Sequence, residues 1–145
     1  MDFSKLNNQI YFENKFVKAE KAKIHVLNHS LHFASSVFEG IRVYNSKSLF
    51  LNDHIDRLFL SAKLMGLKKT VTKKKLERII KKLIKVNKIK DGYIRPIIFR
   101  SSHSMSPETF SCKSLLAIAV WEWGKLFGKD KGIKFLELGT LENYK

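Results

Sequence analysis

Features of secreted and membrane proteins are scarce in this sequence. Its 145 residues contain one cysteine, Cys112, so no disulfide can form within the chain, and we expect a reducing, cytoplasmic location. No apolar run approaches the ~18 residues of a membrane span, and the longest, Leu115–Trp121, has the length of a buried strand. The first residues, MDFSKLNNQIYF, lack a basic segment followed by an apolar one, so they predict no secretory signal.

Two common catalytic signatures are also missing. The sequence has no G-x-x-x-x-G-K-[ST] phosphate loop and no G-x-S-x-G elbow around a serine. It has no internal repeat and no linker. With 44% apolar residues, the chain has the composition of one modest folded domain.

The formal net charge of +15 comes mainly from lysine. The lysines concentrate on predicted helix surfaces such as TKKKLERIIKKLIK, whereas the arginines, which suit bidentate phosphate or base contacts, occur only at positions 42, 57, 78, 95 and 100. We interpret the charge as a solvated surface. A basic nucleic-acid-binding module is the alternative, and it predicts binding that falls steeply with salt.

Alternating and helical patterns predict both strands and helices. The strands are expected at Gln9–Phe12, Lys15–Lys18, Ile24–Leu27, Ile41–Tyr44, Ser48–Leu51, Tyr93–Phe99 and Ser114–Trp121. One helix is expected over about 54–65, capped by Asn52 or Asp53 and stopped at Gly66, and a second from Thr72 to about Val86. The order predicts an α+β fold with a mainly antiparallel sheet and two helices packed on one face.

Three arginine or aromatic positions suggest chemistry. Arg57 is bracketed by apolar residues on the first predicted helix, so it either snorkels to the surface or reaches a fixed anion. Tyr93 and Arg95 alternate on one strand and share a face, which forms either a carboxylate clamp or a solvated surface. Pro96 indicates a free edge or a break in that strand. Trp123 ends the last strand and either lines a cleft or closes the core.

The histidines offer weaker candidates. The spacing of His25, His29 and His32 could gather imidazoles on a helix, but no cysteine or carboxylate completes a metal site nearby, so we expect no metal. A pairing of Ser35 or Ser36 with His32 lacks the surrounding motif of a nucleophilic serine.

Three stretches together resemble a known family. They are LHFASSVFEGIRVYNSKSLFLNDHIDRLFLSAK, KDGYIRPIIF and VWEWG, and in this order and spacing they resemble the small N-terminal domain of branched-chain amino-acid aminotransferases. These are pyridoxal-phosphate enzymes of fold type IV. The resemblance runs from about residue 8 to about residue 135.

The resemblance implies a role for each candidate. Phe38 is expected to wall the pocket for a Leu, Ile or Val side chain, and Gly40 to let the backbone approach cofactor and substrate closely. Arg57 is expected to hold the cofactor phosphate. The residues expected to bind or support the substrate carboxylates and the pocket wall are Tyr93, Arg95, Arg42 and Trp123.

The sequence also departs from the family pattern. Phe33 and Leu126 stand where relatives usually carry tyrosines, which affects the expected specificity. Residues 136–145, LELGTLENYK, replace an Arg- and Pro-containing linker, and no lysine matches the Schiff-base position. We expect 1–135 to form the small domain, 136–145 to be a divergent and possibly out-of-frame tail, and the large cofactor-lysine domain to be absent.

The expected family reaction is amino transfer between Leu, Ile or Val and 2-oxoglutarate through pyridoxal phosphate, with this chain itself an inactive fragment and no catalytic residue of its own. The alternative is a non-catalytic small domain that pairs with a separate chain. Intact relatives are expected to be homodimers or higher homo-oligomers, without nucleic-acid or membrane partners. The composition favours a role in synthesis of branched-chain amino acids over breakdown.

Overall fold

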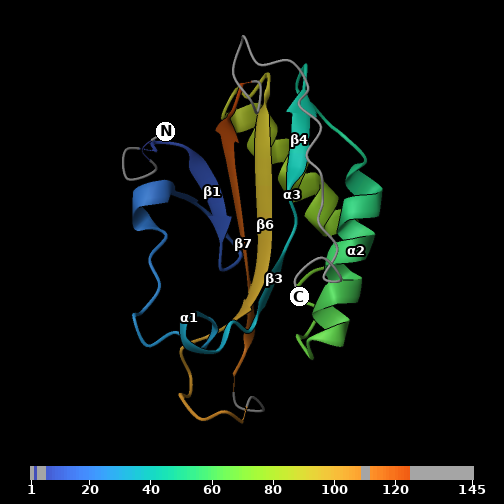
Figure 1. The fold of residues 1–145 in the computed structure, drawn as a ribbon. Helices are drawn as coiled ribbons and strands as arrows, with labels where there is room; N and C mark the ends of the chain where they lie inside the picture. Colours follow the sequence, from blue (N-terminus) through green and yellow to red (C-terminus); the bar gives the residue numbers. More distant parts are fainter. Residues whose placement is uncertain (1, 3–5, 109–111, 125–145) are drawn as a thin grey trace, which may run out of the picture.

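The computed structural model describes residue 2 and residues 6–108 and 112–124. A seven-stranded antiparallel sheet forms its centre (Figure 1), with the order β2-β1-β7-β6-β4-β5 and with β3 also paired to β6. The strands are β1 (Gln9–Phe12), β2 (Lys15–Lys18), β3 (Ser36–Phe38), β4 (Ile41–Tyr44), β5 (Lys47–Ser48), β6 (Gly92–Arg100) and β7 (Ser114–Glu122). The helices are the 3-10 turn η2 (Ala19–Lys21), α1 (His29–Phe33), α2 (Leu51–Leu64) and α3 (Lys73–Val86).

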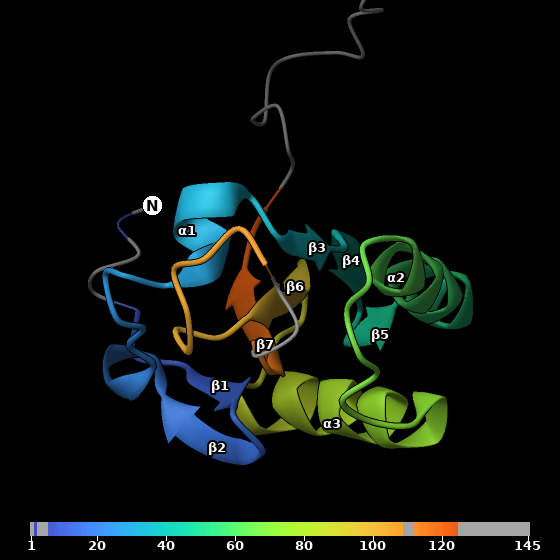
Figure 2. The same cartoon turned by 90° about the horizontal axis from the view of Figure 1, so that it is seen from below.

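Helices α2 and α3 cover one face of the sheet, and the short helix α1 lies on the opposite side (Figure 2). This arrangement confirms the predicted α+β class. The core forms between the two long helices and the sheet, because apolar residues recur every three or four positions along each helix. Its fully buried members include Leu58, Leu76, Ile80, Leu83, Ile41, Ile94, Ile98, Ile118 and Val120.

Alternation along β6 and β7 creates two different sheet faces. In β7, Leu116, Ile118 and Val120 are buried against the helices, whereas Ala117 and Ala119 are half-buried on the other face. The register pairs β6 with β7 over nine residues, from Gly92↔Glu122 to Arg100↔Ser114. The face away from α2 and α3, called the open face below, is therefore continuous across the two longest strands.

The break predicted at Pro96 is confirmed. On that side β6 pairs with β3 through Ile97–Phe99 and with β4 through Gly92–Ile94, so the neighbouring strand is interrupted beside Pro96. The Pro96 carbonyl accepts a hydrogen bond from the Glu39 backbone N–H at 3.1 Å. A proline is tolerated here because the regular ladder is already interrupted.

The second long helix begins as predicted. Thr72 caps α3, with its hydroxyl accepting from the Lys75 N–H at 3.2 Å. Gly66, which follows α2, adopts a left-handed φ of 64°, which glycine accepts without strain.

Three predicted boundaries are wrong. Helix α2 begins at Leu51, and its N-cap is Phe50 rather than Asn52 or Asp53. Burial of Leu51 in the core holds the first turn in place without a side-chain cap, and it also limits the second hairpin to β5 instead of Ser48–Leu51. Residues 24–27 form no strand, because no neighbouring strand pairs with them, and Val26 is 72% exposed.

Candidate functional site

The open face gathers most of the predicted site residues. Arg42 lies opposite Tyr93 in the β4–β6 pair, and Tyr93 lies opposite Trp121 in the β6–β7 pair. One row along β6, Arg95 lies opposite Ala119. Because residues directly opposite one another in a ladder share a face, these side chains project from the same side of the sheet.

Arg95 lies between two aromatic rings. Its guanidinium carbon is 4.3 Å from the Phe38 ring centroid and 5.3 Å from that of Tyr93, both within the range of cation–π attraction. Its Nη2 donates to the Tyr93 hydroxyl at 3.2 Å. Phe38 is 55% exposed, so the Arg95–Phe38 pair borders solvent.

Arg42 is held at the end of β7. Its Nη2 donates to the carbonyl oxygens of Trp123 and Gly124, at 3.1 and 3.2 Å, and its guanidinium lies 5.1 Å from the Tyr44 ring centroid. The Trp123 ring packs edge-on against Tyr93, with ring centroids 5.1 Å apart. These contacts bring Arg42 and Trp123 to the same end of the open face.

Two guanidinium nitrogens on this face are buried without a partner. They are Arg42 Nη1 and Arg95 Nε, and no acceptor among the described residues reaches either atom. Nor does any described acidic side chain form an ion pair with Arg42 or Arg95. Buried donors normally have partners, so these two nitrogens mark where an external acceptor is favoured.

Gly40 makes room for the Tyr93 phenol. A Cβ at this position would lie 1.8 Å from the Tyr93 hydroxyl oxygen and 2.7 Å from its Cζ. The close approach predicted for Gly40 therefore exists, but its partner in the structure is Tyr93. Gly40 determines where the hydroxyl next to Arg95 can lie.

Arg57 lies apart from these residues, on α2. Its Nε and Nη2 donate to the two carboxylate oxygens of Glu39, both at 2.6 Å. His54 Nδ1 is 2.8 Å from Glu39 Oε2, so this nitrogen carries the hydrogen of the bond. Of the two sequence interpretations of Arg57, an anion is found, and it is a carboxylate of the protein.

The Glu39 carboxylate is 4% exposed, whereas the Arg57 side chain is 65% exposed. Burial favours the neutral carboxylic acid, but the hydrogen bonds and positive charges of Arg57 and His54 outweigh it and lower the pKa of Glu39. The same hydrogen bond raises the pKa of Arg57. Glu39 therefore stays ionised in this pair at neutral pH.

Glu39 and His54 are site residues that the sequence reasoning missed. Alternation offered a signal, since Phe38 and Gly40 on the open face place Glu39 toward α2. His54 and Arg57, three residues apart, share a helix face. What was missing from the sequence was the docking of α2 beside this junction.

The suggested pairing of His32 with Ser35 or Ser36 is wrong. His32 Nε2 bonds instead to the Val26 carbonyl at 3.0 Å, and the Ser35 hydroxyl lies 2.7 Å from Nδ1 of the buried His29. These contacts fix α1 and the turn after it. His25 bonds to the Leu27 N–H, so the three imidazoles have separate partners. The described residues contain no group of three or more metal-ligating side chains.

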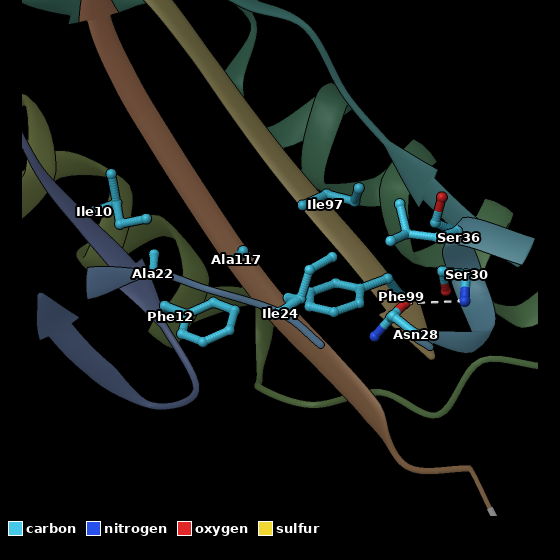
Figure 3. A pocket seen from close by; sticks show the side chains of 11 residues that line it. Ile10, Phe12, Ala22, Ile24, Asn28, Ser30, Ser36, Ile97, Phe99 and Ala117 are labelled. Carbon is cyan, nitrogen blue, oxygen red and sulfur yellow. Dashed lines mark hydrogen bonds between the residues drawn. The ribbon is translucent and has the colours of Figure 1, made fainter. Parts of the chain in front are cut away.

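An apolar cavity of about 290 Å³ continues the open face toward α1 (Figure 3). Ile97, which forms part of its wall, lies opposite Phe38 in the β3–β6 pair. The remaining wall comes from β1, β7, α1 and the segment before α1, and it includes Ile10, Phe12, Ile24, Phe99 and Ala117. The cavity therefore adjoins the Arg95 cluster on the same face of the sheet.

Two further positions bear on specificity. Phe33 ends α1, with its ring 4.5 Å from the His29 ring, and it is 43% exposed. Leu126 and the predicted tail at 136–145 lie outside the described residues. No helix in the described part of the chain is long and apolar enough to cross a bilayer.

The fold and the open face define a small α+β domain that presents arginine and aromatic groups. The model of the class IV amino-transferase family matches residues 36–140, and the chain belongs to this family. The chain corresponds to the N-terminal small domain of the fold.

Relatives with assigned names are branched-chain aminotransferases. The branched-chain-amino-acid aminotransferase of Pseudomonas aeruginosa is 31% identical over 141 residues, which are 92% of this chain and 46% of that protein. The probable branched-chain-amino-acid aminotransferase of Rickettsia bellii is 41% identical over 97 residues, 67% of this chain and 34% of that protein. The chain thus spans less than half the length of these relatives.

Solved structures agree with this fold. The Escherichia coli branched-chain amino acid aminotransferase superposes with a TM-score of 0.77 at 32% identity, covering 81% of this chain and 41% of that one. The enzyme of the archaeon Thermoproteus uzoniensis, solved with norvaline, superposes with a TM-score of 0.76 at 32% identity, covering 81% and 41%. The T.th. enzyme, solved with pyridoxamine 5′-phosphate, superposes with a TM-score of 0.79 at 31% identity, covering 86% and 43%.

Proposed function

We propose that this chain is the substrate-side portion of a branched-chain amino-acid transaminase. The reaction transfers an amino group between Leu, Ile or Val and 2-oxoglutarate through pyridoxal phosphate, in the synthesis of branched-chain amino acids. The named relatives support the reaction class. The T.th. enzyme, solved with 4-methylvaleric acid and with N-(5′-phosphopyridoxyl)-L-glutamate, supports both substrate types.

The two buried, unpartnered guanidinium nitrogens carry this proposal. Both substrates bear carboxylates, and 2-oxoglutarate bears two. A carboxylate above the open face gives Arg42 Nη1 and Arg95 Nε the acceptors that they lack. The Tyr93 hydroxyl, already 3.2 Å from Arg95 Nη2, supplies a further polar contact.

The apolar residues account for the other end of the substrate. Phe38 is exposed beside Arg95 and offers an apolar wall for a branched side chain. Trp123, packed on Tyr93, closes the far side, and Gly40 keeps the Tyr93 ring in place.

Arg57 fits the cofactor phosphate. Its guanidinium is exposed and cationic, and among the described residues no acceptor bonds to its Nη1. When bound, pyridoxal phosphate withdraws electrons from the substrate α-carbon. We assign no catalytic residue within this chain, and we expect it by itself to bind substrates and not to convert them.

Tryptophan fluorescence tests the carboxylate clamp, because both tryptophans of the chain pack beside Tyr93. Titration with 2-oxoglutarate and with 4-methylvalerate should change the emission saturably. Arg95→Gln should weaken binding about tenfold or more, since a charge-assisted contact is lost. Arg78→Gln, on the exposed side of α3, removes the same charge elsewhere and should leave binding unchanged. Equal affinity in both variants would overturn the clamp.

Turnover is measured with leucine, 2-oxoglutarate and added pyridoxal phosphate. Formation of glutamate by the purified chain alone would contradict the assignment of no catalytic residue.

A second function has an observation in its favour. Large apolar side chains are exposed beside the cavity, including Val26 at 72% and Leu31 at 62%. Such patches mark contact sites, so we propose that the open face packs against a further domain or chain, with homo-oligomers as the assembly. A compact monomer in size-exclusion chromatography with light scattering would count against this contact. We also propose a cytoplasmic location, in keeping with the free, buried Cys112, and no nucleic-acid or membrane partner.

A further inference from the structure

The ion pair between Glu39 and Arg57 joins a buried group to an exposed one. The Glu39 carboxylate is 4% exposed, and its backbone N–H is tied to Pro96 of β6 at 3.1 Å. Its position is therefore fixed by the sheet. Arg57 comes from α2, 18 residues further along the chain, and is otherwise surrounded by solvent.

The geometry of the pair leaves one side of the guanidinium available. Glu39 takes Nε and Nη2 of Arg57, both at 2.6 Å, and Nη1 has no acceptor among the described residues. A bidentate contact orients a planar guanidinium, which a single hydrogen bond does not. His54, bonded to Glu39 Oε2 at 2.8 Å, occupies the carboxylate from another side and restricts it further.

We propose that Glu39 is the positioning residue of the phosphate site: it holds Arg57 by the bidentate contact so that Nη1 faces the cofactor phosphate. This inference rests on the proposed role of Arg57 toward that phosphate. Glu39 does not itself touch the ligand. It links the two sides of the site, since its neighbours Phe38 and Gly40 face the substrate side of the sheet.

A simple charge argument makes the opposite prediction. A carboxylate next to Arg57 offsets its positive charge, so removal of Glu39 should strengthen phosphate binding if charge alone decides. Positioning requires that removal weakens binding, because a flexible arginine must be ordered each time the ligand binds. The sign of the effect therefore separates the two.

Nuclear magnetic resonance of the arginine Nε–H groups provides a local readout in the full chain. The probe is pyridoxamine 5′-phosphate, which has no aldehyde to react with surface lysines, and pyridoxamine without phosphate is its control. In the wild type, the Arg57 Nε–H signal should be resolved and protected from solvent exchange. It should then shift saturably with the phosphorylated probe alone.

Two Glu39 variants separate position from charge. Glu39→Gln removes the negative charge, and Glu39→Asp keeps it while withdrawing the carboxylate by one methylene. Both should lose the protected Nε–H signal and bind the probe about tenfold more weakly. Glu39→Asp also serves if Glu39→Gln fails to fold. Glu77→Gln makes the same charge change on α3, where Glu77 pairs with Lys81, and should leave the affinity at Arg57 unchanged.

The outcomes distinguish this inference from the proposed function. Unchanged or tighter probe binding in both Glu39 variants would overturn the positioning role and leave Arg57 as the phosphate ligand. A wild-type Arg57 signal that is ordered but does not respond to the phosphorylated probe would overturn the phosphate role of Arg57, and this proposal with it.

Discussion

Substitution of Gly40 by alanine tests how tightly the open face is packed. The added methyl group would lie 1.8 Å from the Tyr93 hydroxyl oxygen and 2.7 Å from Cζ, so the phenol ring must move. Its neighbours are Trp121 and Trp123, with ring centroids 5.2 and 5.1 Å away, and Arg95, which donates to the hydroxyl.

The expected loss follows from these contacts. An aromatic pair contributes about 0.5–1.5 kcal/mol beyond its buried area, and a hydrogen bond about 0.5–1.5 kcal/mol. Displacing the ring disturbs one or two of these contacts, so Gly40→Ala should lower the free energy of unfolding by about 1–3 kcal/mol, as overpacking generally does.

Urea unfolding followed by tryptophan fluorescence measures this change. Gly124→Ala is the matched control, because a Cβ there meets no atom within 4 Å, and it should change stability by less than about 0.5 kcal/mol. In a Tyr93→Ala background the ring is gone, so Gly40→Ala should then be almost neutral. The reasoning fails if Gly40→Ala is as stable as the wild type, or if it loses the same stability in both backgrounds.

Two further outcomes are expected from buried polar groups. Ser35→Ala leaves Nδ1 of the buried His29 without its partner at 2.7 Å, so thermal or urea unfolding should show a loss of about 1–3 kcal/mol; an unchanged midpoint would contradict the buried pair. The pKa of Glu39 is lower in the folded state than in the unfolded chain, so its ion pair with Arg57 stabilises the fold above the unfolded pKa of about 4.3 and is lost as pH falls through the folded pKa. The stability difference between wild type and Glu39→Gln should thus be constant above pH ~5 and shrink below ~4.3, and a difference that grows on acidification would refute the sign of the shift.

Local patterns in the sequence were sufficient for several elements. The first hairpin, Gln9–Phe12 with Lys15–Lys18, follows from alternation around a two-residue turn, and the structure has the same bounds. Thr72 and the apolar stripe through Leu76 and Ile80 fixed the start and the buried face of α3. These features depend on neighbours within one or two turns of the chain, so the sequence contains them directly.

Helix α2 shows where local patterns fail. Asn52 and Asp53 are good capping residues, yet the helix begins about one turn earlier because Leu51 is buried in the core. Ile24–Leu27 has the composition of a strand but finds no partner strand, and Ile24 instead lines the cavity next to α1. Tertiary packing overrides propensity in both cases.

The site divides in the same way. Alternation by itself placed Tyr93 and Arg95 on one sheet face, because a strand has a period of two. Only the tertiary structure brought Arg42 and Trp123 to the same end of that face, through strand register set between segments 81 residues apart. Only the docking of α2 beside the β3–β4 junction paired Arg57 with Glu39, since side chains on separate elements meet according to packing and not to sequence spacing.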